Sequence, residues 1–244
     1  MFTKKEIFAL IFSLFILSFV FGFDDGTKKL VLNTWLFNFF KIFVLVTLAV
    51  FVRELAMKLH ARTDDALVEY ELWGIRRVWF TGNGLLHRPL YLGTLIAILM
   101  TLSSKGAFFF TALGNHKITE RGSARVGRRL TRLNYSEEAQ IISAGIFANI
   151  FLAILGIFLG RIFHFNAQQF VNINFYLILF NLFPLSNLDG AKLFFGSLLG
   201  YIFMLVFFIV TFFILKISIV LALILAILLA CFATFFYFYK YIYT

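Results

Sequence analysis

Residues 53–57 read Arg-Glu-Leu-Ala-Met, within an apolar stretch, and they keep one chemical group of a zinc-binding helix. A helix that carries His-Glu-x-x-His places two imidazoles on one face, one turn apart, where both reach a zinc ion. The glutamate between them acts as general base toward the water bound to the metal. Here Glu54 is present, while a permanent cation, Arg53, and a thioether, Met57, stand at the two histidine positions.

The donor set around this helix argues against a bound zinc ion. Arg53 stays protonated and would repel a metal cation, and Met57 is a soft ligand that suits copper(I) better than zinc. His60 lies two helical turns beyond Arg53 on nearly the same face, roughly 10 Å away by helix rise. His60 adds at most one ligand in this stretch, whereas a catalytic zinc needs three protein ligands. We therefore expect no metal cofactor. No partner at ligand spacing accompanies the other histidines, which are His87, His116 and His164.

Three further segments follow along the chain. They are Ala-Leu-Val-Glu-Tyr-Glu-Leu-Trp at 66–73, Ser-Ala-Gly-Ile-Phe-Ala-Asn at 143–149 and Asn-Leu-Phe-Pro-Leu-Ser-Asn-Leu-Asp-Gly at 181–190. Together with Glu54, their order resembles that of the site-2 protease family of intramembrane zinc metalloproteases, in its archaeal type. The second segment looks like the Ala-Gly-Pro-x-x-Asn of that family, with Ile146 at the usual proline. The resemblance covers roughly residues 35–195.

The resemblance implies a role for individual residues. The family pairs its metal helix with an Asn-x-x-Pro…Leu-Asp-Gly segment whose aspartate is the third zinc ligand, and that position falls on Asp189. Glu54 then stands where the family has its general base, and Arg53 and Met57 stand at former metal positions. The supporting positions implied by the motifs are Asn149, Asn181, Pro184 and Gly190. Read on its own, Asp189 is also a suitable N-cap for a helix that begins with Asp-Gly-Ala-Lys.

Three functions are consistent with these residues. The leading hypothesis is a catalytically inactive pseudoprotease that binds or scaffolds a transmembrane helix or a membrane-protein client. The first alternative is an active intramembrane zinc endopeptidase with unusual ligands, in which Glu54 is the base, Asp189 binds the metal and His60 is a candidate for a further ligand. The second alternative is a structural subunit of a membrane complex.

The composition is that of a membrane protein. The chain has 244 residues, of which 61% are hydrophobic and only 14% charged, with a mean hydropathy of +0.93. Soluble domains carry about a quarter charged residues. The formal charge of +10 fits basic cytoplasmic loops better than a nucleic-acid partner. Cys231 is the single cysteine, so no disulfide can form within the chain. The partners expected are therefore membrane lipid and a membrane-protein client.

Apolar runs of about 20 residues predict an all-α polytopic membrane protein with about six transmembrane helices. The predicted spans are 7–23, 35–59, 139–163, 169–188, 192–215 and 217–239. Short strands at 67–72 and 107–112 predict a small β-sheet at the membrane surface. We expect one membrane domain over residues 1–244. In this domain, residues 60–138 contain the strands, an ambiguous apolar run and a basic loop. Residues 139–190 form two spans that end in the Leu-Asp-Gly segment, and residues 191–244 form a C-terminal helical hairpin.

The ambiguous run is residues 84–102, which form either a re-entrant segment or a seventh span. The segment 115–138 holds six basic residues against three acidic ones, a net charge of +3, so the positive-inside rule places it in the cytoplasm. Lys4 and Lys5 place the N-terminus there too. The chain must then cross the membrane an even number of times between the N-terminus and this loop, which favours the re-entrant interpretation. Both termini are then cytoplasmic, in a prokaryotic, archaeal-type cell membrane. It also brings Glu54 and Asp189 to the same membrane depth.

A buried carboxylate needs a partner or it takes a proton. In the family, a dication lies between a glutamate and an aspartate from two different helices. Arg53 stands at the first ligand position and its guanidinium can donate bidentate hydrogen bonds to a carboxylate. We therefore predict a salt bridge between Arg53 and Asp189, with Glu54 nearby, although an interfacial ion pair between Arg53 and Glu54 is the simpler alternative.

Overall fold

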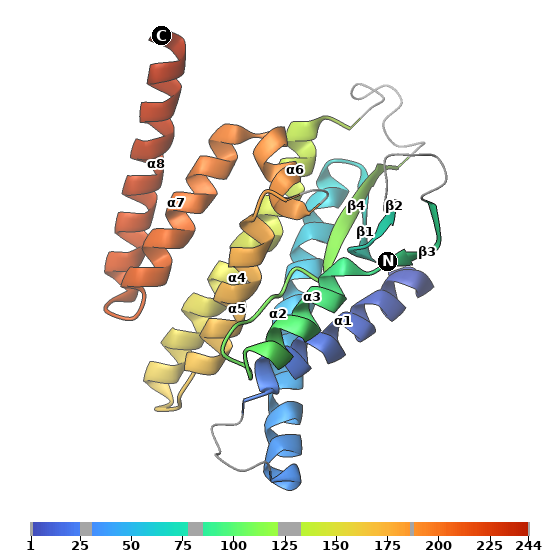
Figure 1. Cartoon of the computed structure of the whole chain (residues 1–244). Coiled ribbons are helices and arrows are strands. Elements are labelled where there is room, and N and C mark those ends of the chain that lie inside the picture. The colour runs from blue at the N-terminus through green and yellow to red at the C-terminus, as the bar shows by residue number, and fades with distance from the viewer. Residues whose placement is uncertain (1, 25–30, 78–84, 122–132, 186–187, 244) are drawn as a thin grey trace. The chain divides into compact units, whose positions relative to one another are not determined.

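The computed structural model describes residues 2–24, 31–77, 85–121, 133–185 and 188–243. Eight α-helices and four β-strands are present in these ranges (Figure 1). The chain divides into two compact units, one formed by residues 1–50 with 69–117 and the other by residues 51–68 with 118–244. Helix α2 (Leu32–Thr63) begins in the first unit and ends in the second.

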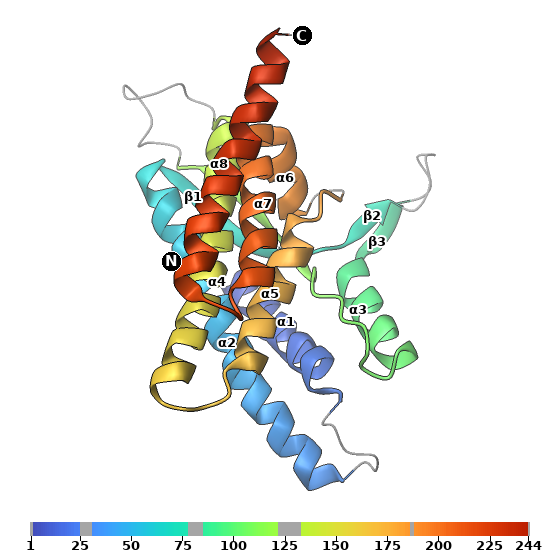
Figure 2. The same ribbon diagram turned by 90° about the vertical axis from the view of Figure 1, so that its left-hand side faces the viewer.

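The first unit contains two helices besides the start of α2. Helix α1 (Lys4–Gly22) begins with a capping box in which the Thr3 hydroxyl and the Glu6 carboxylate each accept a hydrogen bond from the other's backbone amide. It packs against α3 (Leu92–Ser103). The strands β2 (Ile75–Arg77) and β3 (Leu85–Leu90) pair antiparallel beside α3 (Figure 2). Two polar side chains join α1 to a strand, because Ser13 Oγ lies 2.8 Å from the hydroxyl of Tyr70.

The second small sheet consists of β1 (Ala66–Leu72) and β4 (Gly114–Glu120). The predicted strand at 67–72 is thereby confirmed. The predicted strand at 107–112 is wrong, because the chain there completes the turn that ends α3. The backbone amides of Ala107 and Phe108 bond to the carbonyl and hydroxyl oxygens of Ser104, so pairing starts only at Gly114.

The second unit is a helical bundle. Its helices are α4 (Tyr135–Ile162), α5 (Gln168–Leu182), α6 (Asp189–Gly196), α7 (Leu198–Ile214) and α8 (Ile219–Tyr243). Isoleucines at fourth positions of α4, Ile142, Ile146 and Ile150, are buried in its core. Helices α7 and α8 form an antiparallel hairpin in both views (Figure 1, Figure 2). Every fourth residue on the inner face of α8 is a fully buried alanine, namely Ala222, Ala226 and Ala230.

The described helices support a membrane-embedded protein. Four of them, α1, α2, α4 and α8, are long and apolar enough to cross a bilayer. On α8 large aromatic side chains such as Phe232 and Phe235 are two-thirds exposed, and soluble proteins rarely expose contiguous apolar surface on this scale. Each of the six predicted apolar segments contains a helix in the described residues. However, the 15 residues of α5 rise only about 22 Å, and residues 192–215 are divided at Ser197, so the six-span count stays a prediction.

The ambiguous run at 84–102 is neither a full span nor a hairpin of two helices. It contains the strand β3 followed by α3. With 12 residues, α3 rises about 18 Å, which is less than the hydrocarbon core of about 30 Å. The seventh-span alternative is therefore wrong. Whether this short helix enters the membrane from one side stays a prediction.

Candidate functional site

The site lies within the second unit and begins with the last turns of α2. Arg53, Glu54 and Met57 are all buried there, with exposed fractions of 6%, 1% and 0%. Arg53 and Met57 are one helical turn apart and therefore share a face of α2. This is the face that would present two imidazoles if both positions held histidine. Polar burial of this kind needs a partner for each charge.

Arg53 finds its partner on another helix. Its Nη2 atom lies 2.7 Å from Oδ2 of Asp189, and both side chains are almost completely buried. The bond joins positions 136 residues apart and is short enough to be a charge-assisted hydrogen bond. The salt bridge predicted from the sequence is thereby confirmed. Glu54 follows Arg53 directly in the helix and is equally buried, while its place beside the ion pair stays a prediction.

The start of α6 positions the aspartate. Asp189 is the first residue of this helix and the N-cap is Leu188, so the alternative of Asp189 as N-cap is wrong. A carboxylate in the first turn is also favoured by the helix dipole. At Gly190 a Cβ atom would lie only 2.5 Å from the carbonyl oxygen of Phe183, just beyond the end of α5. The glycine therefore lets the start of α6 approach the end of α5 and carry Asp189 into the core.

A second glycine, on α4, lets this helix approach the face of α2 that carries Arg53 and Met57. A Cβ atom at Gly145 would lie 2.8 Å from Met57 Cγ and 3.2 Å from Arg53 Cγ. Met57 fills the space that this glycine leaves open. It belongs to a buried apolar cluster with Ala61, Ala66, Val68 and Ile141. Its thioether is thus a packed core group.

The supporting positions are placed differently from one another. Asn149 is buried one turn beyond Gly145 on α4, and its Oδ1 atom has no hydrogen-bond partner among the described residues. Asn181 is buried on α5, but its side-chain amide donates to the carbonyl of Leu177 in its own helix at 2.5 Å. Pro184 is exposed in the loop after α5. The motif residues therefore do not all face one cavity.

The histidines are dispersed over the described part of the chain. His60 Nε2 lies 3.7 Å from Asp64 Oδ2, four residues further along the chain. His116 is buried on β4 with its ring against Tyr70 in the first unit, and His164 is exposed after α4. His87 lies on β3, with its side chain outside the described part of the structure. Within the described residues, no group of three His, Cys, Asp or Glu side chains is placed to hold a metal.

The residues present do not fit a catalytic zinc ion. Arg53 is a permanent cation, Met57 is a thioether packed against Gly145, and an oxygen of Asp189 accepts a hydrogen bond from the guanidinium. Zinc requires nitrogen, oxygen or thiolate donors that converge on one point. The arrangement instead joins α2 to α6 through an ion pair and α2 to α4 through close packing.

Sequence reasoning missed two contacts that hold this arrangement in place. One is the approach of Gly145 to Met57, for which the only signal was the glycine within the segment 143–149. The other is a hydrogen bond of 2.6 Å from Lys58 Nζ to the carbonyl of Val68, which ties the end of α2 to the first residues of β1. In the sequence, the position of Lys58 directly after Met57 does not indicate that its side chain bonds to a strand.

Comparison of the chain with protein-family models, with curated proteins and with solved structures finds no match. The resemblance to the site-2 protease family therefore rests on the motif residues and their order along the chain.

Proposed function

We propose that this chain is a site-2-protease-like membrane protein without proteolytic activity, which binds a transmembrane segment of a client protein. The single observation that carries the proposal is the buried bond between Arg53 and Asp189. It joins the first and third metal positions implied by the resemblance. A guanidinium held at 2.7 Å from the third ligand occupies the charge and the space that a metal would need.

Electrostatics supports the proposal, because the positive charge of Arg53 can replace that of a metal ion. Carboxylates from two helices, Glu54 and Asp189, are both buried in this unit. Removing a dication without replacement would leave each acid unneutralised at membrane depth, which is costly. The cation at position 53 neutralises Asp189 and keeps α2 joined to α6. The scaffold can then persist without catalysis, which suits a protein that retains, presents or stabilises a client.

Metal content tests the first half of the proposal. Purified wild-type protein should contain no stoichiometric zinc by elemental analysis. The double substitution Arg53→His with Met57→His restores the ligand pattern, and it should bind zinc stoichiometrically and lose it again when Asp189→Ala is added. Stoichiometric zinc in the wild type, lost on Asp189→Ala, would support the active endopeptidase instead. Failure of the double variant to bind zinc, although it is folded, would contradict the metal-site origin of the three positions.

Site-specific photocrosslinking tests the second half. Leu55 is 41% exposed on α2, beside the buried motif residues, and Phe232 is 66% exposed on α8. A photoreactive residue at position 55 should capture a client helix in the membrane, whereas the same group at position 232 should capture lipid alone. Equal capture at both positions contradicts a client site at α2. A partner recovered in fixed stoichiometry with the protein from both positions identifies a structural subunit of a complex.

A further inference from the structure

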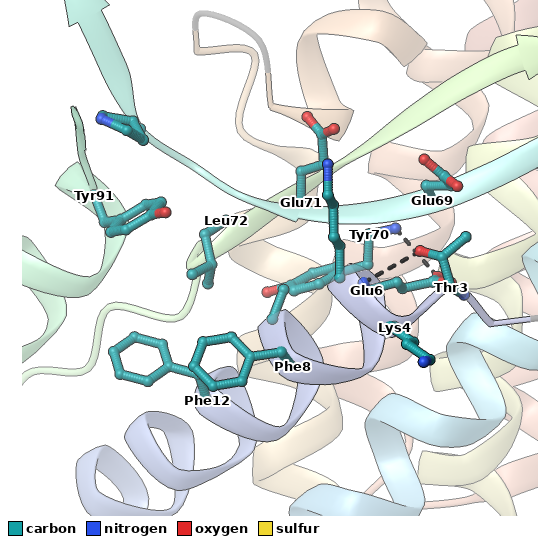
Figure 3. A pocket seen from close by; sticks show the side chains of 14 residues that line it. Thr3, Lys4, Glu6, Phe8, Phe12, Glu69, Tyr70, Glu71, Leu72 and Tyr91 are labelled. Atoms are coloured by element: carbon teal, nitrogen blue, oxygen red, sulfur yellow. Dashed lines mark hydrogen bonds between the residues drawn. The ribbon is translucent and has the colours of Figure 1, made fainter. Parts of the chain in front are cut away.

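A groove of about 750 Å³ opens in the first unit, away from the motif residues. Its walls come from the start of α1, from the strand β1 with Gly74 after it, and from Pro89 and Tyr91 just before α3 (Figure 3). The volume is within the range of pockets that bind small molecules. The groove is separate from the residues of the proposed function, because none of the residues at positions 53, 57 or 189 lines it.

Four charged side chains of both signs line the groove. Lys4 and Lys5 come from α1, and Glu69 and Glu71 come from β1. In the described part of the chain, none of the four forms an ion pair or a side-chain hydrogen bond. The third carboxylate, Glu6, is already committed, because it accepts hydrogen bonds from the backbone amides of Thr3 and Tyr70. Two cations and two anions therefore remain for a ligand that carries both charges.

The charges and the apolar side chains occupy different walls of the groove. Figure 3 shows Phe8 and Phe12 on the α1 side of β1, whereas the carboxylates of Glu69 and Glu71 project to the other side of the strand. Lys4 lies on the α1 side with the two rings. Phe8 is 72% exposed, and further exposed apolar side chains continue along α1. Apolar side chains, the two lysines and the two carboxylates therefore line one groove from different walls.

We infer that the groove binds a phospholipid whose headgroup carries a primary ammonium beyond its phosphate. Its acyl chain would lie along Phe8 and Phe12, its phosphate beside Lys4 and Lys5, and its ammonium beside the two carboxylates. Helix α1 is long and apolar enough to cross a membrane, and the two lysines are at its first residues. They therefore lie where lipid phosphates are found when α1 spans the bilayer. A primary ammonium donates three hydrogen bonds, which a quaternary one cannot.

Native mass spectrometry in detergent tests this assignment with lipids of identical acyl chains. The wild type should bind phosphatidylethanolamine about threefold more tightly than phosphatidylcholine or phosphatidylglycerol, the order expected for exposed charge pairs. Glu69→Gln with Glu71→Gln should abolish the preference over phosphatidylcholine and leave phosphatidylglycerol favoured. Lys4→Gln with Lys5→Gln should weaken all three lipids. Lys105→Gln with Lys117→Gln, which removes two exposed lysines of the same unit, should behave as the wild type.

A second measurement needs no variant and therefore does not depend on their folding. Stepwise N-methylation of phosphatidylethanolamine should lower its affinity for the wild-type protein progressively. Equal affinity for the whole methylation series, or tightest binding of phosphatidylglycerol by the wild type, overturns the assignment. So does recovery of a bound peptide from the groove of the purified protein in place of a lipid.

Discussion

At the scale of single residues, the second unit is organised by one buried charge and its partner. Asp189 is completely buried at the start of α6 and has a guanidinium 2.7 Å away. Coulomb attraction in such surroundings is strong, but it only offsets the loss of hydration of both ions. The pair therefore specifies where α2 meets α6 more than it adds to net stability. Removing one partner alone leaves the other charge buried and unpaired, so its lost hydration is no longer offset.

We predict that Arg53→Ala lowers the free energy of unfolding by about 3–5 kcal/mol, the usual cost of leaving one buried charge unpaired. Arg53→Ala combined with Asp189→Ala should recover part of that loss. Unfolding in mixed detergent micelles, followed by circular dichroism, measures both. The matched control is Arg62→Ala, an exposed arginine near the end of the same helix, which should change stability little. Additive losses from the two substitutions would show that the charges are not coupled.

At the scale of helices and strands, close approach at glycine determines how the second unit packs. Gly145 admits Met57 between α4 and α2, and Gly190 admits the carbonyl of Phe183 beside the start of α6. Neither glycine has a positive φ in the structure, so the requirement at each is space and not backbone conformation. Both contacts form on the helices that carry the ion pair.

Gly190→Ala should destabilise the protein by about 1–3 kcal/mol, since the new methyl group meets backbone atoms that cannot rotate away. The matched control is Gly200→Ala on α7, where a Cβ atom would meet only the side chain of Ser197. Thermal unfolding compares the two variants. The explanation by backbone crowding fails when Gly200→Ala is as destabilising as Gly190→Ala.

Hydropathy located the helices because a run of about 20 apolar residues has few other stable structures in a membrane. The ion pair was predictable for a different reason, since Arg53 stands at the first ligand position implied by the resemblance and a buried Asp189 needs a cationic partner. Breaks inside apolar runs were not predictable. Ser197 adopts an extended backbone that separates α6 from α7, although it lies between Gly196 and Leu198 in an otherwise apolar run. Strand β4 was missed because the preceding residues form a local turn that no periodic pattern reveals.

At the scale of the whole chain, the arrangement relative to the bilayer follows from charge. The basic residues of 115–138 fall partly outside the described ranges, which end at 121 and resume at 133. We nevertheless predict that this loop and the C-terminus share the cytoplasmic side. After replacement of the exposed Cys231 by serine, single cysteines at Ser123 and at Thr244 should react with an impermeant maleimide from the same side. Labelling from opposite sides would contradict the parity of an even number of crossings between them.

The pair formed by Arg53 and Asp189 also constrains how this sequence can change. A single substitution of Arg53 by histidine removes the cation, but it leaves Asp189 buried and charged with too few donors to bind a metal. A single change of Met57 to histidine sets an imidazole into the tight contact with Gly145, next to a guanidinium that excludes metal. Each single substitution should therefore destabilise the protein without creating a metal site. Because the ion pair opposes each single change, a metal-binding version of this sequence requires concerted substitutions.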